Sequence, residues 1–156
     1  MSEKSRVNDA IVRLTKYCAY QDRCKKEIDQ KLYDLELSES EKNQVWDYLI
    51  KENYHDEERY VRSIVRGRFF YKSWGRVKIR YYLAQQGIDS TIVEDVIQHE
   101  IKAKDYQEKI RTLVQSKLGL KESLTFEEKQ KMIRSLYQKG YESDLVISEL
   151  ENLGED

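Results

Sequence analysis

The stretch IRYYLAQQGIDSTIVEDVI at residues 79–97 recurs in altered form as MIRSLYQKGYESDLVISEL at residues 132–150. At this offset of 53 residues, Gly87 meets Gly140 between two apolar patterns of helical period. The apolar residues correspond as well: Leu83 with Leu136, Ile92 with Leu145, Val93 with Val146 and Ile97 with Leu150. A helical pattern, a glycine and a second helical pattern are typical of two helices joined by a tight turn.

A looser copy of this pattern precedes both, at an offset of 51 residues. Ile28 and Leu32 take the places of Ile79 and Leu83 there, and Glu36 takes the place of the glycine. A period near 50 residues indicates a repeated supersecondary unit, which completes its small core by stacking on its neighbours. A single irregular helical domain with chance internal similarity is the alternative.

Helix-capping signals divide the chain into nine expected helices. Ser38 with Glu41 and Thr125 with Glu128 form capping boxes, and the fourth helix is expected to end at about Lys72. The expected openings are at Asn8 or Asp9, Cys24, Ser38, Asp56, Gly75, Asp89, Asp105, Thr125 and Ser143. We therefore predict an all-α fold of three tandem three-helix units, residues 1–54, 55–104 and 105–156, in an elongated, curved array.

Composition supports helices and excludes several classes of protein. The chain has no proline and six glycines, and 37% of its residues are charged. It has no apolar run of about 18 residues, so we expect no membrane span.

Cys18 and Cys24 fit neither a disulfide framework nor a zinc site, so we expect reduced thiols and a cytoplasmic location. We also expect a monomer. His55 and His99 have no ligand cluster around them, so we expect no metal, no cofactor and no enzymatic activity.

Charge is divided unevenly along the chain. Residues 59–88 contain eight Lys or Arg residues and no Asp or Glu, whereas the residues before and after this segment are net acidic. The candidate contacts for an anionic partner are Arg59, Arg62, Arg66, Arg68, Lys72, Arg76, Lys78 and Arg80. Like charges three or four residues apart on a helix repel, and an anionic partner would relieve that repulsion.

Helical geometry arranges these cations in stripes. Arg59, Arg62 and Arg66 form one stripe that Phe70 is expected to continue, and Arg76 shares another with Arg80. Interleaved aromatic residues could stack on nucleic-acid bases. In the alternative interpretation, Trp74, Tyr82 and one phenylalanine belong to the core, and the arginines form a solvated face paired with the acidic flanking units.

Three segments carry a family resemblance: NYHDEERYVRSIVRGRF (53–69), WGRVKIRYYLAQQGID (74–89) and CKKEIDQKL (24–32). They resemble the RecX family, the small regulators of the RecA recombinase. The first is similar to the family's "gYlDDerfA…vrsr" signature, the second to its "G…rI…eL…kGI" segment, and the third to its "S…EL…KL" stretch. The chain departs from these patterns where Cys24 replaces a serine cap, where Asn53 replaces a glycine, and where His55 and Glu57 replace Leu and Asp.

The resemblance implies three tandem three-helix units and binding to RecA or the RecA–DNA filament. It also implies a regulator of homologous recombination and DNA repair that inhibits or modulates strand exchange and RecA's ATP hydrolysis. Weak direct DNA binding stays open. The runner-up is a nucleic-acid-binding protein that acts without RecA, through units that resemble helix-turn-helix modules.

Overall fold

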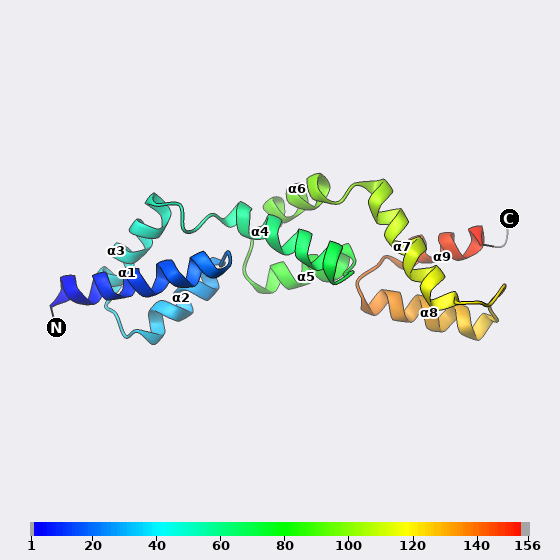
Figure 1. Cartoon of the computed structure of the whole chain (residues 1–156), viewed down its shortest axis with the longest axis horizontal. Coiled ribbons are helices and arrows are strands. Elements are labelled where there is room, and N and C mark those ends of the chain that lie inside the picture. The colour runs from blue at the N-terminus through cyan, green and yellow to red at the C-terminus, as the bar shows by residue number, and fades with distance from the viewer. Residues whose placement is uncertain (1, 154–156) are drawn as a thin grey trace.

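The computed structural model describes residues 2–153, and all regular secondary structure within them is helical (Figure 1). The first unit contains α1 (Glu3–Tyr20), α2 (Lys25–Asp34) and α3 (Glu39–Lys51). The second contains α4 (Glu57–Arg66), the π-helix η1 (Gly67–Tyr71), α5 (Arg76–Gln85) and α6 (Ser90–Glu100). The third contains α7 (Ala103–Leu118), α8 (Phe126–Gln138) and α9 (Ser143–Asn152). The all-α prediction is confirmed.

The helices are grouped in triplets along an elongated array. The main helix pairs, α1 with α3, α4 with α6 and α7 with α9, each lie within one triplet. Figure 1 shows the triplets in a row, with α2, α5 and α8 along its lower edge. The unit boundaries at residues 54/55 and 104/105 stay a prediction, since the triplets locate the helices but not the limits of independent domains.

Three of the predicted helix starts were wrong. α1 begins at Glu3 rather than after Asn8 or Asp9, because the Ser2 hydroxyl accepts a hydrogen bond from the Ser5 N–H at 3.1 Å. α7 begins at Ala103, so Asp105 lies in its first turn instead of capping it. α9 has Glu142 as its N-cap, and Ser143 is its first helical residue. Acids in a first turn are favoured by the helix dipole, so they do not by themselves mark the cap.

The fourth helical segment does extend to Lys72, but its last turn is a π-helix. The Lys72 N–H donates to the Gly67 carbonyl at 3.2 Å, five residues back. A π-turn inserts one residue into the helical register, and such turns are frequent at functional sites. The insertion rotates every side chain after Gly67 relative to the α4 face.

The end of the second helix in each unit has the same left-handed backbone. Gly87 and Gly140 have φ of 78° and 100°, and Glu36, at the equivalent position of the first unit, has φ of 55°. Glycine adopts this conformation without steric cost, whereas a residue with a Cβ is strained there. Asn53, which stands where the family has a glycine, is also left-handed, with φ of 62°. The left-handed backbone is therefore the feature that the three units share, and glycine is the residue that adopts it without strain.

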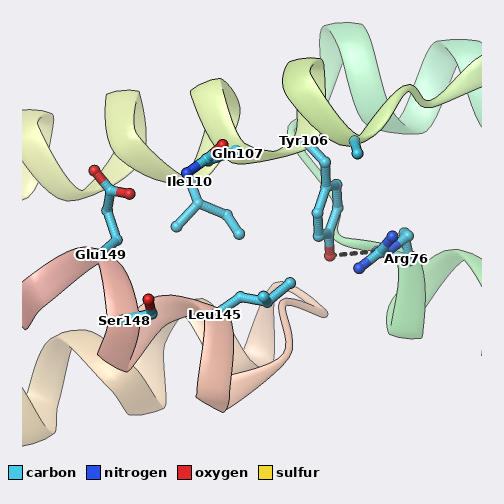
Figure 2. A pocket seen from close by; sticks show the side chains of 8 residues that line it. Arg76, Tyr106, Gln107, Ile110, Leu145, Ser148 and Glu149 are labelled. Atoms are coloured by element: carbon cyan, nitrogen blue, oxygen red, sulfur yellow. Dashed lines mark hydrogen bonds between the residues drawn. The ribbon is translucent and has the colours of Figure 1, made fainter. Parts of the chain in front are cut away.

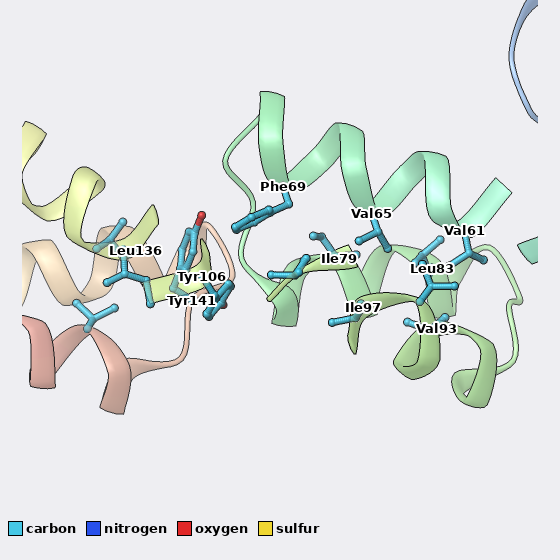
Figure 3. Packing of buried hydrophobic residues seen from close by; sticks show 14 of the residues in the cluster. Val61, Val65, Phe69, Ile79, Leu83, Val93, Ile97, Tyr106, Leu136 and Tyr141 are labelled. Carbon is cyan, nitrogen blue, oxygen red and sulfur yellow. The ribbon is translucent and has the colours of Figure 1, made fainter. Parts of the chain in front are cut away.

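The second and third units share one hydrophobic core (Figure 3). Phe69 stacks on Tyr106 with ring centroids 5.8 Å apart, and Tyr106 contacts Tyr141 at 5.4 Å. These rings connect the core around Val65 to the core around Leu136. The first unit has a core of its own, except that Cys24 belongs to the shared cluster.

A backbone contact between two glycines joins the second unit to the third. The Gly75 N–H donates to the Lys139 carbonyl at 2.7 Å, and the Val77 N–H donates to the Gly140 carbonyl at 3.0 Å. A Cβ on Gly75 would lie 2.3 Å from the carbonyl carbon and oxygen of Gly140. The turn before α5 can therefore dock against the turn after α8 because neither glycine has a side chain.

The junction of the first and second units is polar. The Arg59 Nε donates to Asp22 at 2.7 Å, and the Lys26 ammonium donates to the Gln85 carbonyl at 3.1 Å. Cys24 is fully buried there, and its thiol donates to the Gln86 side chain at 3.6 Å. Both cysteines are free, and burial raises the pKa of each thiol, so they remain protonated.

Replacing Glu36 with glycine should stabilise the chain. The left-handed strain at this position disappears, at the cost of a more flexible unfolded chain, and we expect a net gain of about 0.5–1 kcal/mol. Urea denaturation measures the change. Glu36→Ala is the control because it removes the same charge and keeps the Cβ. An alanine variant as stable as the glycine variant would show that strain is not the cause.

Replacing Gly75 with alanine should separate the second and third units. The added Cβ meets backbone atoms that cannot move aside singly, so the free energy of unfolding should fall by about 3 kcal/mol. Gly67→Ala is the matched control, because Gly67 has φ of −64° and a Cβ added there would have nothing within 4 Å. That change should stabilise the chain by about 0.4–1 kcal/mol. Equal unfolding midpoints for the two variants would contradict the close contact.

Candidate functional site

The eight predicted cations lie on three consecutive parts of the second unit. Arg59, Arg62 and Arg66 are in α4, Arg68 is in η1, Lys72 follows η1, and Arg76, Lys78 and Arg80 are in α5. All eight lie on one unit, but they differ in whether a carboxylate of the chain pairs with them. Five arginines are paired with carboxylates, and three cations are not.

The α4 stripe is present and borders a groove of about 430 Å³. We call it the α4 groove; its lining residues are Asp22, Arg59, Arg62, Ser63, Arg66, Gly67 and Tyr71. Phe70 was expected to continue the stripe, and this was wrong. The π-turn places Tyr71 beside the arginines instead, with its side chain 88% exposed. Phe70 packs edge-on against Phe69.

Carboxylates from neighbouring elements hold the stripe arginines. Arg66 is 2.6 Å from Glu100 at the end of α6, and Arg62 is 3.8 Å from the same residue. Arg62 also pairs with Glu58 at 3.0 Å. The repulsion expected within this stripe is therefore offset by acids of the chain itself, and removing Arg62 and Arg66 would leave Glu100 without these partners.

Two arginines of α5 are held in the same way. Arg80 donates to both oxygens of Glu94, at 2.6 and 3.2 Å. Arg76 reaches into the third unit and donates to Glu142 at 2.6 and 2.9 Å. The other oxygen of Glu142 accepts from the Tyr106 hydroxyl at 2.5 Å, and burial, together with this bond, raises the Tyr106 pKa well above its ordinary value. Arg76 therefore joins two units and has a structural role.

The remaining three cations have no carboxylate partner among residues 2–153. Arg68 lies 5.3 Å from the ring centroids of both Trp74 and Tyr82, and Lys78 lies 4.4 Å from Trp74. Lys72 is exposed two residues before Trp74. We call Arg68, Lys72, Trp74, Lys78 and Tyr82 the Trp74 patch. The Arg68 Nε is buried without a hydrogen-bond partner, which leaves a donor unsatisfied next to these rings.

The alternative interpretation of the aromatic residues is right in part. Phe69 is buried, and Trp74 and Tyr82 are partly buried against the shared core, with their rings edge-to-face at 5.8 Å. The polar half of that interpretation holds for Arg59 and Arg76, which pair with Asp22 of the first unit and Glu142 of the third. Arg62, Arg66 and Arg80 pair instead with acids of the second unit itself. Sequence spacing could not show this pairing, because Asp22, Glu94, Glu100 and Glu142 come from other helices or turns.

The third helices of the second and third units are acidic. α6 contains Glu94, Asp95 and Glu100, and α9 contains Asp144, Glu149 and Glu151, and neither helix has a Lys or Arg. In helix-turn-helix proteins the recognition helix enters the major groove between two rows of phosphates. Helices of this charge would be repelled there, which disfavours that mode of binding.

A pocket of about 340 Å³ lies between α7 and α9 (Figure 2). Ile110 and Leu145 form its apolar walls, and Arg76, whose backbone N–H donates to the Tyr106 hydroxyl at 3.1 Å, closes one end.

Within the described part of the chain, no group of three His, Cys, Asp or Glu residues could hold a metal ion. No helix among residues 2–153 is long and apolar enough to cross a membrane.

The chain is a helical-repeat protein of three tandem three-helix units, and the middle unit has a cationic, aromatic surface. Comparisons with known proteins identify its family. Residues 56–97 match the second three-helix domain of RecX, and residues 104–148 match its third three-helix domain. The two matches follow each other in the order of the units. The chain belongs to the RecX family.

Curated relatives agree with these matches. The regulatory protein RecX of Staphylococcus carnosus is 30% identical over 139 residues, which cover 88% of this chain and 51% of the relative. That of Staphylococcus haemolyticus is 29% identical over 133 residues, covering 83% and 48%. That of Bacillus mycoides is 25% identical over 150 residues, covering 96% and 56%. The chain thus spans about half the length of the curated relatives it matches.

Solved structures show the same fold. The crystal structure of RecX from Lactobacillus salivarius superposes with a TM-score of 0.85 and 24% identity, covering 98% of this chain and 99% of that one. A second crystal structure of regulatory protein RecX superposes with a TM-score of 0.79 and 20% identity, covering 96% and 73%. The predicted fold is thereby confirmed by the domain matches in sequence and by the superposition on solved structures.

Proposed function

We propose that this chain regulates homologous recombination and DNA repair by binding RecA or the RecA–DNA filament, and that it inhibits or modulates strand exchange and ATP hydrolysis. Membership of the RecX family across the second and third units carries this proposal. The elongated array supports it, because stacked units present one long surface that can contact more than one subunit of a filament (Figure 1).

The Trp74 patch is the part of the second unit that we propose faces the filament. Its three cations have no internal carboxylate among the described residues, so a partner's anionic groups would be their first counter-charges. Lys and Arg beside partly buried aromatic rings suit either phosphates with stacked bases or an acidic protein surface. Arg59, Arg62, Arg66, Arg76 and Arg80 are engaged internally and contribute less to first contact.

Nucleic-acid binding without RecA is the second candidate. The same patch could bind a phosphate backbone directly, and affinity would then fall steeply with salt. The acidic charge of α6 and α9 counts against insertion of the third helices into a DNA groove. Dependence on RecA separates the two functions.

The triple variant Arg68→Gln, Lys72→Gln and Lys78→Gln should weaken inhibition of RecA. We expect roughly tenfold more protein to be needed for half-inhibition of DNA-dependent ATP hydrolysis and strand exchange, because up to three anion contacts are lost. The unchanged chain should inhibit both activities of its cognate RecA. Circular dichroism checks that the helices remain, and Lys72→Gln with Lys78→Gln tests the patch without touching Arg68.

The matched control is Lys4→Gln, Arg13→Gln and Lys16→Gln on α1. This variant removes the same charge from an exposed helix of the first unit. It should inhibit RecA as well as the parent chain does. Equal weakening of both triple variants would show that only net charge matters, and full inhibition by the patch variant would remove the patch from the interface. If the parent chain leaves RecA unaffected, the proposed function itself is wrong.

A further inference from the structure

We propose that α6 is an internal competitor for the α4 groove, and that the groove binds the phosphodiester backbone of a nucleic acid when the α6 carboxylate is displaced. The competitor is Glu100, whose side chain holds Arg62 and Arg66. This inference rests on the proposed function in one respect: it takes the second unit as the side of the chain that meets an anionic polymer.

The groove has the composition of a phosphate site. Three guanidinium groups border it, and Ser63 and the exposed ring of Tyr71 lie among them. Arginine presents planar, bidentate donors that match phosphate as well as carboxylate. The π-turn at Gly67 brings Tyr71 to this position, where its ring could stack on a base next to a bound phosphate.

Glu100 lies outside the groove lining and reaches the arginines from the end of α6. Its carboxylate is 2.6 Å from the Arg66 Nε and 3.8 Å from the Arg62 Nε, and Arg62 also pairs with Glu58 at 3.0 Å. One acidic side chain thus contacts two of the three guanidinium groups. Asp22 occupies the third, Arg59, from the first unit at 2.7 Å. The groove is therefore a set of anion sites that the chain itself has filled.

Exchange of Glu100 for a phosphate should be easy. The side chains of Arg62 and Arg66 are 40% and 61% exposed, whereas that of Glu100 is 16% exposed. Because the guanidinium side of each ion pair faces water, the pairs are weakened and screened by salt. Glu100 is also the last residue of α6, where the helix dipole disfavours a negative charge. A polyanion that releases counterions from several phosphates can therefore compete, whereas a single phosphate ion gains little.

The inference gives α6 a regulatory role at this surface. The carboxylate shields the groove from weak or monovalent anions and leaves it available to a nucleic-acid strand that is already held by the Trp74 patch. A second acid of α6, Glu94, pairs with Arg80 of α5 through both of its oxygens. The affinity of the α4 groove for a nucleic acid then depends on the acids that compete for its arginines as well as on the arginines themselves.

The test is Glu100→Gln, measured by fluorescence anisotropy with a labelled oligo-dT strand. Removing the Glu100 charge frees Arg66 and leaves Arg62 paired with Glu58 alone. Binding should tighten about two- to fivefold at low salt, the range expected when a surface ion pair no longer competes. Asp95→Asn is the matched control, because Asp95 is on the same helix, loses the same charge, and pairs with His99 at 3.6 Å rather than with an arginine of the groove. It should leave affinity for the strand close to that of the parent.

A double-mutant cycle locates the gain. In a chain that already carries Arg62→Ala and Arg66→Ala, adding Glu100→Gln should bring no further tightening. Equal affinities for Glu100→Gln, Asp95→Asn and the parent would overturn the inference. A Glu100→Gln chain that inhibits RecA more strongly without binding the strand better would also overturn it, because the partner of the groove would then be an acidic protein surface. These outcomes concern Glu100 and oligo-dT, so they are separate from RecA inhibition by the parent chain.

Discussion

The contact between Gly75 and Gly140 fixes the arrangement of the second and third units. Because the two backbones touch, the rings of Phe69, Tyr106 and Tyr141 can meet and form one core from two repeats. The same approach brings Arg76 within reach of Glu142. One glycine of this contact is the repeat glycine itself, so the residue that ends α8 also determines how the units stack.

The first unit is attached differently. It has its own core, and the Asp22–Arg59 and Lys26–Gln85 contacts that join it to the second unit are partly exposed. Solvent-exposed ion pairs contribute little to stability, so this junction should open more easily than the apolar one. The first unit should therefore move relative to the second more easily than the second and third units move relative to each other.

Much of the fold could be predicted from the sequence, because helical period and capping residues are local signals. The repeat between residues 79–97 and 132–150, the caps at Ser38 and Thr125 and the turn at Gly87 all follow from such signals. The π-turn could not be predicted, since no local sequence signal marks it; it contains Phe69, whose ring stacks on Tyr106 of the third unit. The candidate site was only partly predictable. The sequence located the basic unit, but it did not show which cations are already paired with acids far away in the sequence, such as Glu100 and Glu142, and which are left for a partner. The contrast between Arg66, which is paired, and Lys78, which lies over Trp74, exists only in three dimensions.

Hydroxyl-radical footprinting of the chain bound to the RecA–DNA filament tests most directly whether the second unit is the contact surface. Tyr71 and Tyr81 are 88% and 66% exposed in the second unit, and Tyr20 and Tyr33 are 83% and 70% exposed in the first. We expect the filament to protect Tyr71 and Tyr81 from oxidation and to leave Tyr20 and Tyr33 reactive. Protection of Tyr20 and Tyr33 instead, with Tyr71 and Tyr81 still fully reactive, would contradict a contact surface on the second unit.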